Sequence, residues 1–203
     1  MLEVNKNRYH KNLLIVVIST LLITSHVSAN ENTTKKNQST HNELRSLLQK
    51  AIKDSNSFSD RYDAEVWLLD MSNRLKGKIK DPEKRLNLLR LIHQEASKAE
   101  LHPELVLAVI DVESNFDRFA ISKAGAQGLM QVMPFWLKEI GKPRDSLFNI
   151  RTNLRMGCTI LKYYLNKEKG DLTRALARYN GSLGRFKYPN KVFKLLNKRW
   201  YKQ

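Results

Sequence analysis

The amino-acid sequence predicts an all-α protein built from several short helices. Apolar residues recur at three- and four-residue steps, the spacing that gives a helix one apolar face. No stretch alternates apolar and polar residues for long, so no extended sheet is predicted. Glycine and proline stand at the ends of the periodic segments, where they stop helices. With 203 residues, the chain is long enough for one domain with a sizeable core.

Residues 1–29 have the pattern of a secretory signal peptide. Basic residues precede an apolar run at 13–23, and Val27 and Ala29 have the small-residue spacing that signal peptidase reads. The run is shorter than the roughly 20 apolar residues of a membrane span. We therefore expect cleavage near Ala29, export to the periplasm or cell envelope, and no membrane span in the mature form. Retention of the segment as an anchor is the alternative.

The next segments are expected to be a disordered leader and N-terminal helices. Residues 30–40 are polar and lack apolar periodicity. Residues 41–80 contain two periodic apolar sets, which predict helices that pack on the domain that follows at 81–203. The sets are Leu44, Leu47, Leu48 and Ile52, then Tyr62, Val66, Leu69 and Leu75.

Three helices of the main domain have clear capping residues at their starts. Asp81 precedes Pro82 and an acidic first turn, and Asn149 and Asp171 precede later periodic segments. A short helix is expected after Met133-Pro134, and the last one from Pro189 to Trp200. The segment between the Glu113 helix and Met133 has no periodicity and predicts an irregular loop.

The segment 105–114 predicts a short helix that is apolar on nearly every side, and such a helix belongs in a core. It carries Glu113 in its last turn, while Asp111 points to nearly the opposite side. Burial and the negative end of the helix dipole both favour the protonated form of Glu113. A carboxyl group that is protonated near neutral pH can act as a general acid. The alternative is a glutamate that is solvated or paired with a basic residue.

Composition restricts the class of partner. The net charge of +16 predicts attraction to a polyanion or an acidic surface. The basic residues are scattered without a nucleic-acid motif, so we expect no nucleic acid partner. The histidines lack ligand spacing, so no metal and no cofactor are predicted. The single cysteine, Cys158, lies in an apolar helical run and is expected in the core.

Four blocks of sequence occur in order along the second half of the chain. They are Glu113-Ser114-Asn115-Phe116 with Ala120-Ile121-Ser122; Gly125 to Pro134; Asn149-Ile150 with Gly157 and Tyr164-Leu165; and Ala177-Arg178-Tyr179-Asn180-Gly181. Together they resemble the signature of family 1 lytic transglycosylases, the SLT-domain enzymes related in fold to goose-type lysozyme. The resemblance covers roughly residues 85–200. It implies a lysozyme-like multi-helix domain with extra N-terminal helices.

The resemblance also implies a bacterial enzyme that acts on the glycan strands of peptidoglycan. Such enzymes cleave the β-1,4 bond between N-acetylmuramic acid and N-acetylglucosamine and leave a 1,6-anhydro end without adding water. By position, Glu113 is the single catalytic residue, which acts first as acid and then as base. Because the sugar supplies the nucleophile, a second carboxylate is not required, unlike in most glycosidases.

The same resemblance implies substrate-binding roles for Ser114, Met130, Gln131, Tyr179 and Asn180. Ser114 would orient Glu113 or the substrate, and Met130 and Gln131 would contact sugar. Tyr179 and Asn180 would lie near the acid. Each role has an alternative: Met130 as core packing, Ser114 as a helix-end hydrogen bond, and Asn180 as a helix stop.

Two other functions remain open at this point. A lysozyme-like hydrolase of the same bond would follow if Asp117 faced Glu113 across the cleft. A wall-binding or assembly protein of a secretion apparatus would use an SLT fold and residues 41–80 to dock on a cell-envelope partner. We expect a monomer in either case. Arg118 and the run 181–184 depart from the usual family residues, which leaves substrate preference open.

Overall fold

The fold is described by a computed structural model, which covers residues 61–141 and 143–201. The signal peptide predicted at 1–29, the leader at 30–40 and the first predicted helix within 41–60 lie outside the described residues. The helices are α2 (Arg61–Leu75), α3 (Pro82–Lys98), α4 (Pro103–Glu113), α5 (Phe135–Ile140), α6 (Ile150–Lys167), α7 (Leu172–Tyr179), α8 (Lys187–Leu195) and the π-helical turn η1 (Leu196–Trp200). In these residues the only β structure is a set of isolated bridges. The predicted all-α class is confirmed.

The three predicted caps are confirmed. The side chain of Asp81 accepts hydrogen bonds from the backbone N–H groups of the first turn of α3. Asn149 does the same for α6, and Asp171 for α7. These bonds satisfy N–H groups that have no acceptor within the helix. The starts of these helices are therefore determined locally.

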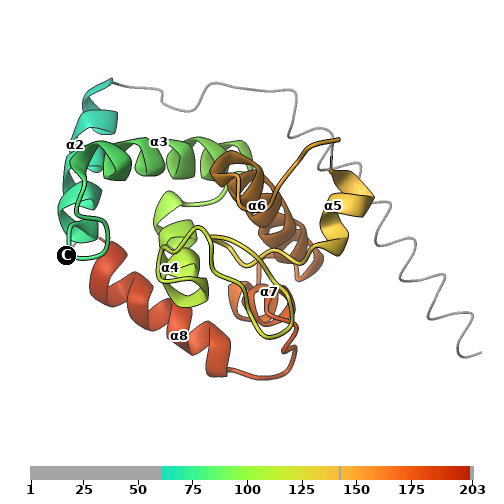
Figure 1. The fold of residues 1–203 in the computed structure, drawn as a ribbon. Coiled ribbons are helices and arrows are strands. Elements are labelled where there is room, and N and C mark those ends of the chain that lie inside the picture. Colours follow the sequence, from blue (N-terminus) through green and yellow to red (C-terminus); the bar gives the residue numbers. More distant parts are fainter. Residues whose placement is uncertain (1–60, 142, 202–203) are drawn as a thin grey trace, which may run out of the picture. The chain divides into compact units, whose positions relative to one another are not determined.

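Helix α4 is the centre of the described part of the chain. Figure 1 shows α4 between α3 and α8, and α4 contacts α3, α8 and η1. Every residue from 105 to 110 is at most 5% exposed, as expected for a helix that is apolar all round. Helix α6 packs against both α3 and α7. The core therefore surrounds the helix that ends at Glu113.

Two sequence predictions about helix faces and ends are wrong. In α2, Val66 and Leu69 are 60% and 66% exposed, whereas Leu68 and Met71 are buried beside the correctly predicted Leu75. The buried stripe faces α3, which the sequence of α2 alone does not reveal. Helix α8 begins at Lys187 and not at Pro189. Proline is tolerated there because N–H groups in a first helical turn lack intrahelical acceptors.

Helix α2 is tied to the C-terminal end of the chain. It contacts α3 and η1, and Nη1 of Arg74 donates hydrogen bonds of 2.7 Å and 3.1 Å to the backbone carbonyls of Arg199 and Tyr201. Buried Arg85 of α3 donates to Ser72 of α2 and to the carbonyls of Ile79 and Lys80. This part of the predicted 41–80 segment thus packs on α3 and η1.

Candidate active site

Glu113 lies where the buried helix α4 meets a pocket. The pocket has a volume of about 320 Å³. Its lining residues come from the end of α4, the turn after α7 and the start of α8: Val112, Glu113, Asn180, Ser182, Arg185, Lys187, Tyr188 and Lys191. Within the described residues, Glu113 is the only acidic residue of this lining. The apolar body of α4 fixes the position of the carboxyl group.

Tyr188 is the hydrogen-bond partner of Glu113. Its hydroxyl donates to Oε1 of Glu113 at 2.6 Å. Burial raises the pKa of Glu113 to about 7, and the hydrogen bond from Tyr188 acts in the opposite direction. The direction of the shift is the one that the sequence predicts. Near neutral pH the carboxyl group therefore exists in both protonation states, as a group that gives and then takes a proton requires.

Tyr188 is itself held as a proton donor. Burial, and next the negative charge of Glu113, raise the pKa of Tyr188 well above its usual value. The side chain is buried at the start of α8, and α8 packs directly on α4. The sequence alone does not indicate Tyr188 as a site residue. Its only local signal is a tyrosine in the first turn of an amphipathic helix, which does not point to Glu113.

Asp111 anchors the other side of α4. Its buried carboxylate pairs with Nζ of Lys78 at 2.7 Å and with Nη1 of Arg199 at 2.9 Å. Lys78 also donates to the side chain of Asn115, two residues after Glu113. The two cations come from the α2–α3 connection and from η1. The end of α4 is thus held by the α2–α3 connection and by η1, with Asp111 paired and Glu113 in the lining of the pocket.

The loop after α4 is held by a buried asparagine of α6, a role that the sequence alone also does not indicate. Asn153 Oδ1 accepts from the backbone N–H of Met130 at 2.8 Å, and Nδ2 donates to the carbonyls of Gln127 and Leu147, both at 2.9 Å. Gly128 has φ +77°, and a Cβ there would meet the Asn153 side chain and Leu147 O. Glycine is therefore required at this position.

The structure brings only some of the predicted site residues to the pocket. Asn180 lines it together with Glu113. The hydroxyl of Tyr179 donates to the backbone carbonyl of Met130 at 2.8 Å and not to Glu113. Burial is the main cause that raises the pKa of Tyr179, and the negative charge of Glu113 is the second. Ser114 Oγ donates to the carbonyl of Ile110 at 3.2 Å, which is the helix-end bond of the alternative interpretation.

Met130 and Gln131 occupy structural positions. The Met130 side chain is fully buried against Gly157 and Cys158, so a contact between it and sugar does not fit this structure. Its place in the core corrects the expected substrate contact. Cys158 is buried as predicted, and burial raises the pKa of its thiol. Gln131 has φ +50°, and its Nε2 donates to the carbonyls of Ala120 and Gly128.

Asp117 does not lie opposite Glu113 in the pocket lining. Its carboxylate is exposed and accepts a hydrogen bond of 2.8 Å from the backbone N–H of Phe119. The lining from the described residues therefore contains one carboxyl group, three basic side chains and two small polar ones beside Val112 and Tyr188. Such a site can donate one proton and take it back, and it holds no second carboxylate to activate a water molecule.

A known protein family and several known proteins are similar to this chain. The family model of the transglycosylase SLT domain matches residues 90–199. A membrane-bound lytic murein transglycosylase C from Photorhabdus laumondii is 34% identical in an alignment over 112 residues that covers 47% of this chain and 31% of the relative. The chain thus spans about a third of the length of the curated relatives that it matches.

Solved structures of lytic transglycosylases are also similar to this chain. An inactive mutant of the lytic transglycosylase Slt from Pseudomonas aeruginosa has a TM-score of 0.41 at 30% identity, over 56% of this chain and 18% of that one. The 70 kDa soluble lytic transglycosylase from Escherichia coli has a TM-score of 0.42 at 25% identity, over 68% of this chain and 23% of that one.

Proposed function

This chain belongs to the transglycosylase SLT domain family, and from that premise we propose that it is a peptidoglycan lytic transglycosylase. The observation that carries the proposal is Glu113, a single carboxyl group with a pKa of about 7 that accepts a hydrogen bond from Tyr188. The names of the similar proteins, which are murein transglycosylases, support the substrate class. The family match also supports an enzyme over a purely wall-binding protein.

In the proposed reaction, Glu113 acts twice. Its protonated form gives a proton to the glycosidic oxygen as the bond between that oxygen and C1 of N-acetylmuramic acid breaks. The resulting carboxylate then takes the proton of the C6 hydroxyl, whose oxygen forms a new bond to C1. The product is a 1,6-anhydro end, and Glu113 returns to its protonated form. A pKa near the working pH suits both half-reactions.

The other polar groups of the site have supporting roles in this proposal. Tyr188 orients the carboxyl group and stabilises its charged form by donating a hydrogen bond. Asn180 lies in the pocket lining, which supports a role in binding the sugar. We assign Tyr179 and Gln131 to holding the cleft wall, since their side chains bond to backbone carbonyls of the loop. We assign Ser114 a structural role at the end of α4, where its hydroxyl donates to the carbonyl of Ile110.

The proposed place of action is the cell envelope. The signal-peptide pattern at 1–29 and the net charge of +16 support export and attraction to an acidic wall. Among the described residues, none of the helices combines the length and apolar character that crossing a bilayer would need. Release into the periplasm after cleavage near Ala29, the monomeric state and an assembly partner stay predictions.

Digestion of purified peptidoglycan tests the proposal. The wild-type protein should release muropeptides with anhydro ends, which mass spectrometry detects because they are one water lighter than reducing-end products. Glu113→Gln should keep the fold and lose nearly all turnover. Products with reducing ends alone would replace the proposal with a lysozyme-like hydrolase. Binding to peptidoglycan without any released product would replace it with a wall-binding role.

A further inference from the structure

The pocket around Glu113 has a basic rim, which we define as Arg185, Lys187 and Lys191. All three side chains are exposed. Among the described residues, none of the three has an acidic partner, although many basic residues elsewhere in the chain do. Three cations without an acidic partner among the described residues therefore share one pocket with a single half-buried acid. Like charges so close together repel each other, and a bound anion would relieve that repulsion.

The local sequence places the basic rim around the entrance to the acid. Gly181 and Gly184 have φ +69° and +85°, and Arg185 N–H donates to the carbonyl of Ser182 at 2.9 Å, so the chain turns tightly before α8. Lys187 and Lys191 are four residues apart and lie one turn from each other on α8. Tyr188 lies between them in sequence and contacts Glu113.

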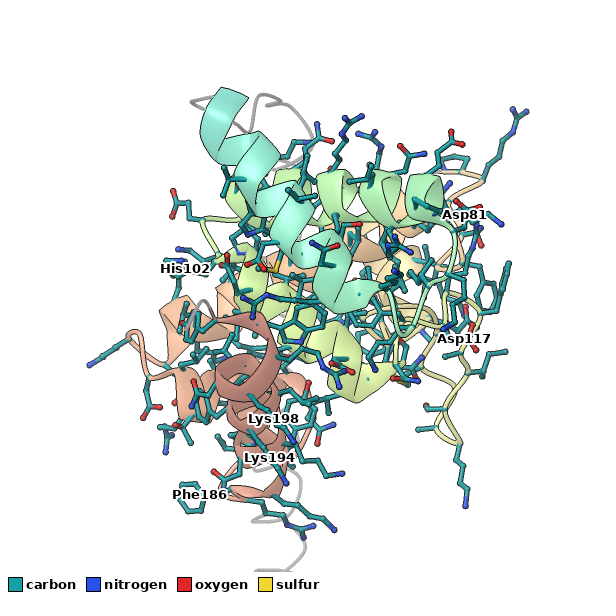
Figure 2. The ribbon with its side chains drawn as sticks, turned by 90° about the vertical axis from the view of Figure 1, so that its left-hand side faces the viewer. Asp81, His102, Asp117, Phe186, Lys194 and Lys198 are labelled. Atoms are coloured by element: carbon teal, nitrogen blue, oxygen red, sulfur yellow. The ribbon has the colours of Figure 1, made fainter. Side chains whose placement is uncertain are left out.

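The same side of the C-terminal helices continues the positive charge away from the pocket. Lys194 and Lys198 follow at steps of three and four residues. Figure 2 shows both side chains extending from this helical segment, with Phe186 at the end where α8 begins. A ligand that reaches Glu113 and also has an acidic arm can thus meet cations both in the pocket and along α8.

Among the described residues, the cations of the basic rim form no ion pair with Glu113. Burial raises the pKa of Glu113 to about 7, and the influence that opposes burial is the Tyr188 hydrogen bond. Cations close to the carboxylate would hold its pKa down. The three side chains therefore line the pocket without forming an ion pair with the acid, and their charge is available to a ligand.

Peptidoglycan carries matching negative charge on only one of its two sugars. N-acetylglucosamine is neutral, whereas N-acetylmuramic acid has a lactyl arm that ends in a free carboxylate or in a peptide stem with carboxylates of its own. We propose that the basic rim binds carboxylate groups of this lactyl-peptide arm, an inference that rests on the proposed function. The pocket then selects muramic acid strands over neutral strands of the same β-1,4 linkage, and Arg185, Lys187 and Lys191 determine this specificity.

Binding measurements in the Glu113→Gln background test this inference without turnover. Three ligands are titrated by calorimetry: a neutral β-1,4 oligomer of N-acetylglucosamine, glycan fragments stripped of stems so that the lactyl carboxylate is free, and fragments that keep their stems. The rim variant carries Arg185→Gln, Lys187→Gln and Lys191→Gln. The matched control carries Arg90→Gln, Lys84→Gln and Lys138→Gln, which also removes one arginine and two lysines but from exposed positions on α3 and α5.

The rim variant should bind the carboxylate-bearing fragments about tenfold more weakly, because three exposed charge contacts are lost. Its dissociation constant for the neutral oligomer should not change, and the control variant should match the parent for all ligands. A loss confined to stem-bearing fragments assigns the contact to the stem, and a loss also seen with stripped fragments assigns it to the lactyl carboxylate. Equal effects on neutral and acidic ligands, or no effect on either, would overturn the inference.

The two proposals fail in different ways. If wild-type protein releases anhydro ends while the rim variant binds every ligand like its parent, only the role of the basic rim is wrong. If no anhydro ends form but the rim variant still loses affinity for acidic fragments, the reaction is wrong and the binding site stands. Circular dichroism of each variant confirms that the fold is intact.

Discussion

The hydroxyl of Tyr188 donates a hydrogen bond of 2.6 Å to Oε1 of Glu113, although 75 residues separate the two in the chain. The bond joins the first turn of α8 to the last residue of α4. Burial raises the pKa of Glu113 and this bond lowers it, and the balance lies at about 7. The protonation of the proposed acid thus depends on how α8 packs against α4.

Tyr188→Phe should move the pH dependence of activity to higher pH. The substitution removes the hydrogen bond that stabilises the charged carboxylate, so the pKa of Glu113 should rise above about 7. In the proposed reaction, cleavage requires the protonated acid, so the alkaline limb of kcat/KM against pH should shift to higher pH. Release of anhydro ends from soluble glycan strands, measured across pH, gives the profile.

Tyr179→Phe is the matched control. It also removes one buried hydroxyl, but that hydroxyl bonds to the carbonyl of Met130 and not to Glu113. Its alkaline limb should stay where the wild-type limb lies, while the free energy of unfolding falls by about 1 kcal/mol. An alkaline limb of Tyr188→Phe that stays in place, or moves to lower pH, would contradict the assigned hydrogen bond.

Glu113→Gln should stabilise the protein at alkaline pH. The pKa of Glu113 is about 7 in the folded state against 4.5 for a free side chain. The folded state therefore binds more protons between these pH values, and its stability falls as pH rises through that window. Glutamine cannot ionise, so the variant escapes this loss, which is on the order of 3 kcal/mol. Urea unfolding at pH 4 and pH 8 measures it.

At pH 4 both side chains are neutral in the folded state, and the two proteins should have nearly equal free energies of unfolding. The acidic measurement thus serves as the internal control for effects of the substitution other than charge. A difference between variant and wild type that is the same at both pH values would show that Glu113 is not held in a desolvated position.

Features that depend on neighbouring residues in the chain were predictable from the sequence. Asp81, Asn149 and Asp171 cap helices because a side chain bonds to backbone groups two or three residues later. The position of Glu113 followed from the apolar body of α4, which has to be buried whichever elements surround it. These inferences needed no knowledge of tertiary contacts.

Features that depend on tertiary partners were not predictable in the same way. Tyr188 and Asn153 act on groups far away in sequence, and neither stands in a pattern that indicates its partner. Met130 sits in a motif that suggests sugar contact, but the absence of a side chain at Gly157 opens a space in the core for it. In α2, packing on α3 selects which of two apolar stripes is buried.

Removing both cations that pair with Asp111 should destabilise the protein strongly. Lys78→Met with Arg199→Met leaves a carboxylate that is 4% exposed without its ion-pair partners. An unpaired buried charge costs about 3 kcal/mol or more in free energy of unfolding. Urea unfolding at pH 7 measures the loss. Adding Asp111→Leu to the pair should restore part of it, because an apolar side chain has no charge to leave unpaired; no recovery would contradict this explanation.

Gly128→Ala should cost more stability than a glycine substitution at an equally strained but open position. Gly128 has φ +77°, and an added Cβ would lie 2.5 Å from Leu147 O and against the Asn153 side chain. Gly170 has φ +88°, and nothing lies within 4 Å of its Cβ position. Gly170→Ala therefore incurs only the left-handed backbone cost of about 1 kcal/mol. Gly128→Ala adds a steric clash, for a total of about 3 kcal/mol.

The same pair of variants tests whether the loop is part of the catalytic apparatus. Displacing Asn153 breaks its bond to the N–H of Met130, whose carbonyl accepts from Tyr179 beside the pocket. Gly128→Ala should therefore lower kcat at a temperature where the variant is still folded, whereas Gly170→Ala should not.

The stability comparison has its own contradicting outcome. Equal losses of stability in the two variants would show that Leu147 and Asn153 move to make room for the added methyl group. Glycine at 128 would then be needed only for its left-handed backbone conformation.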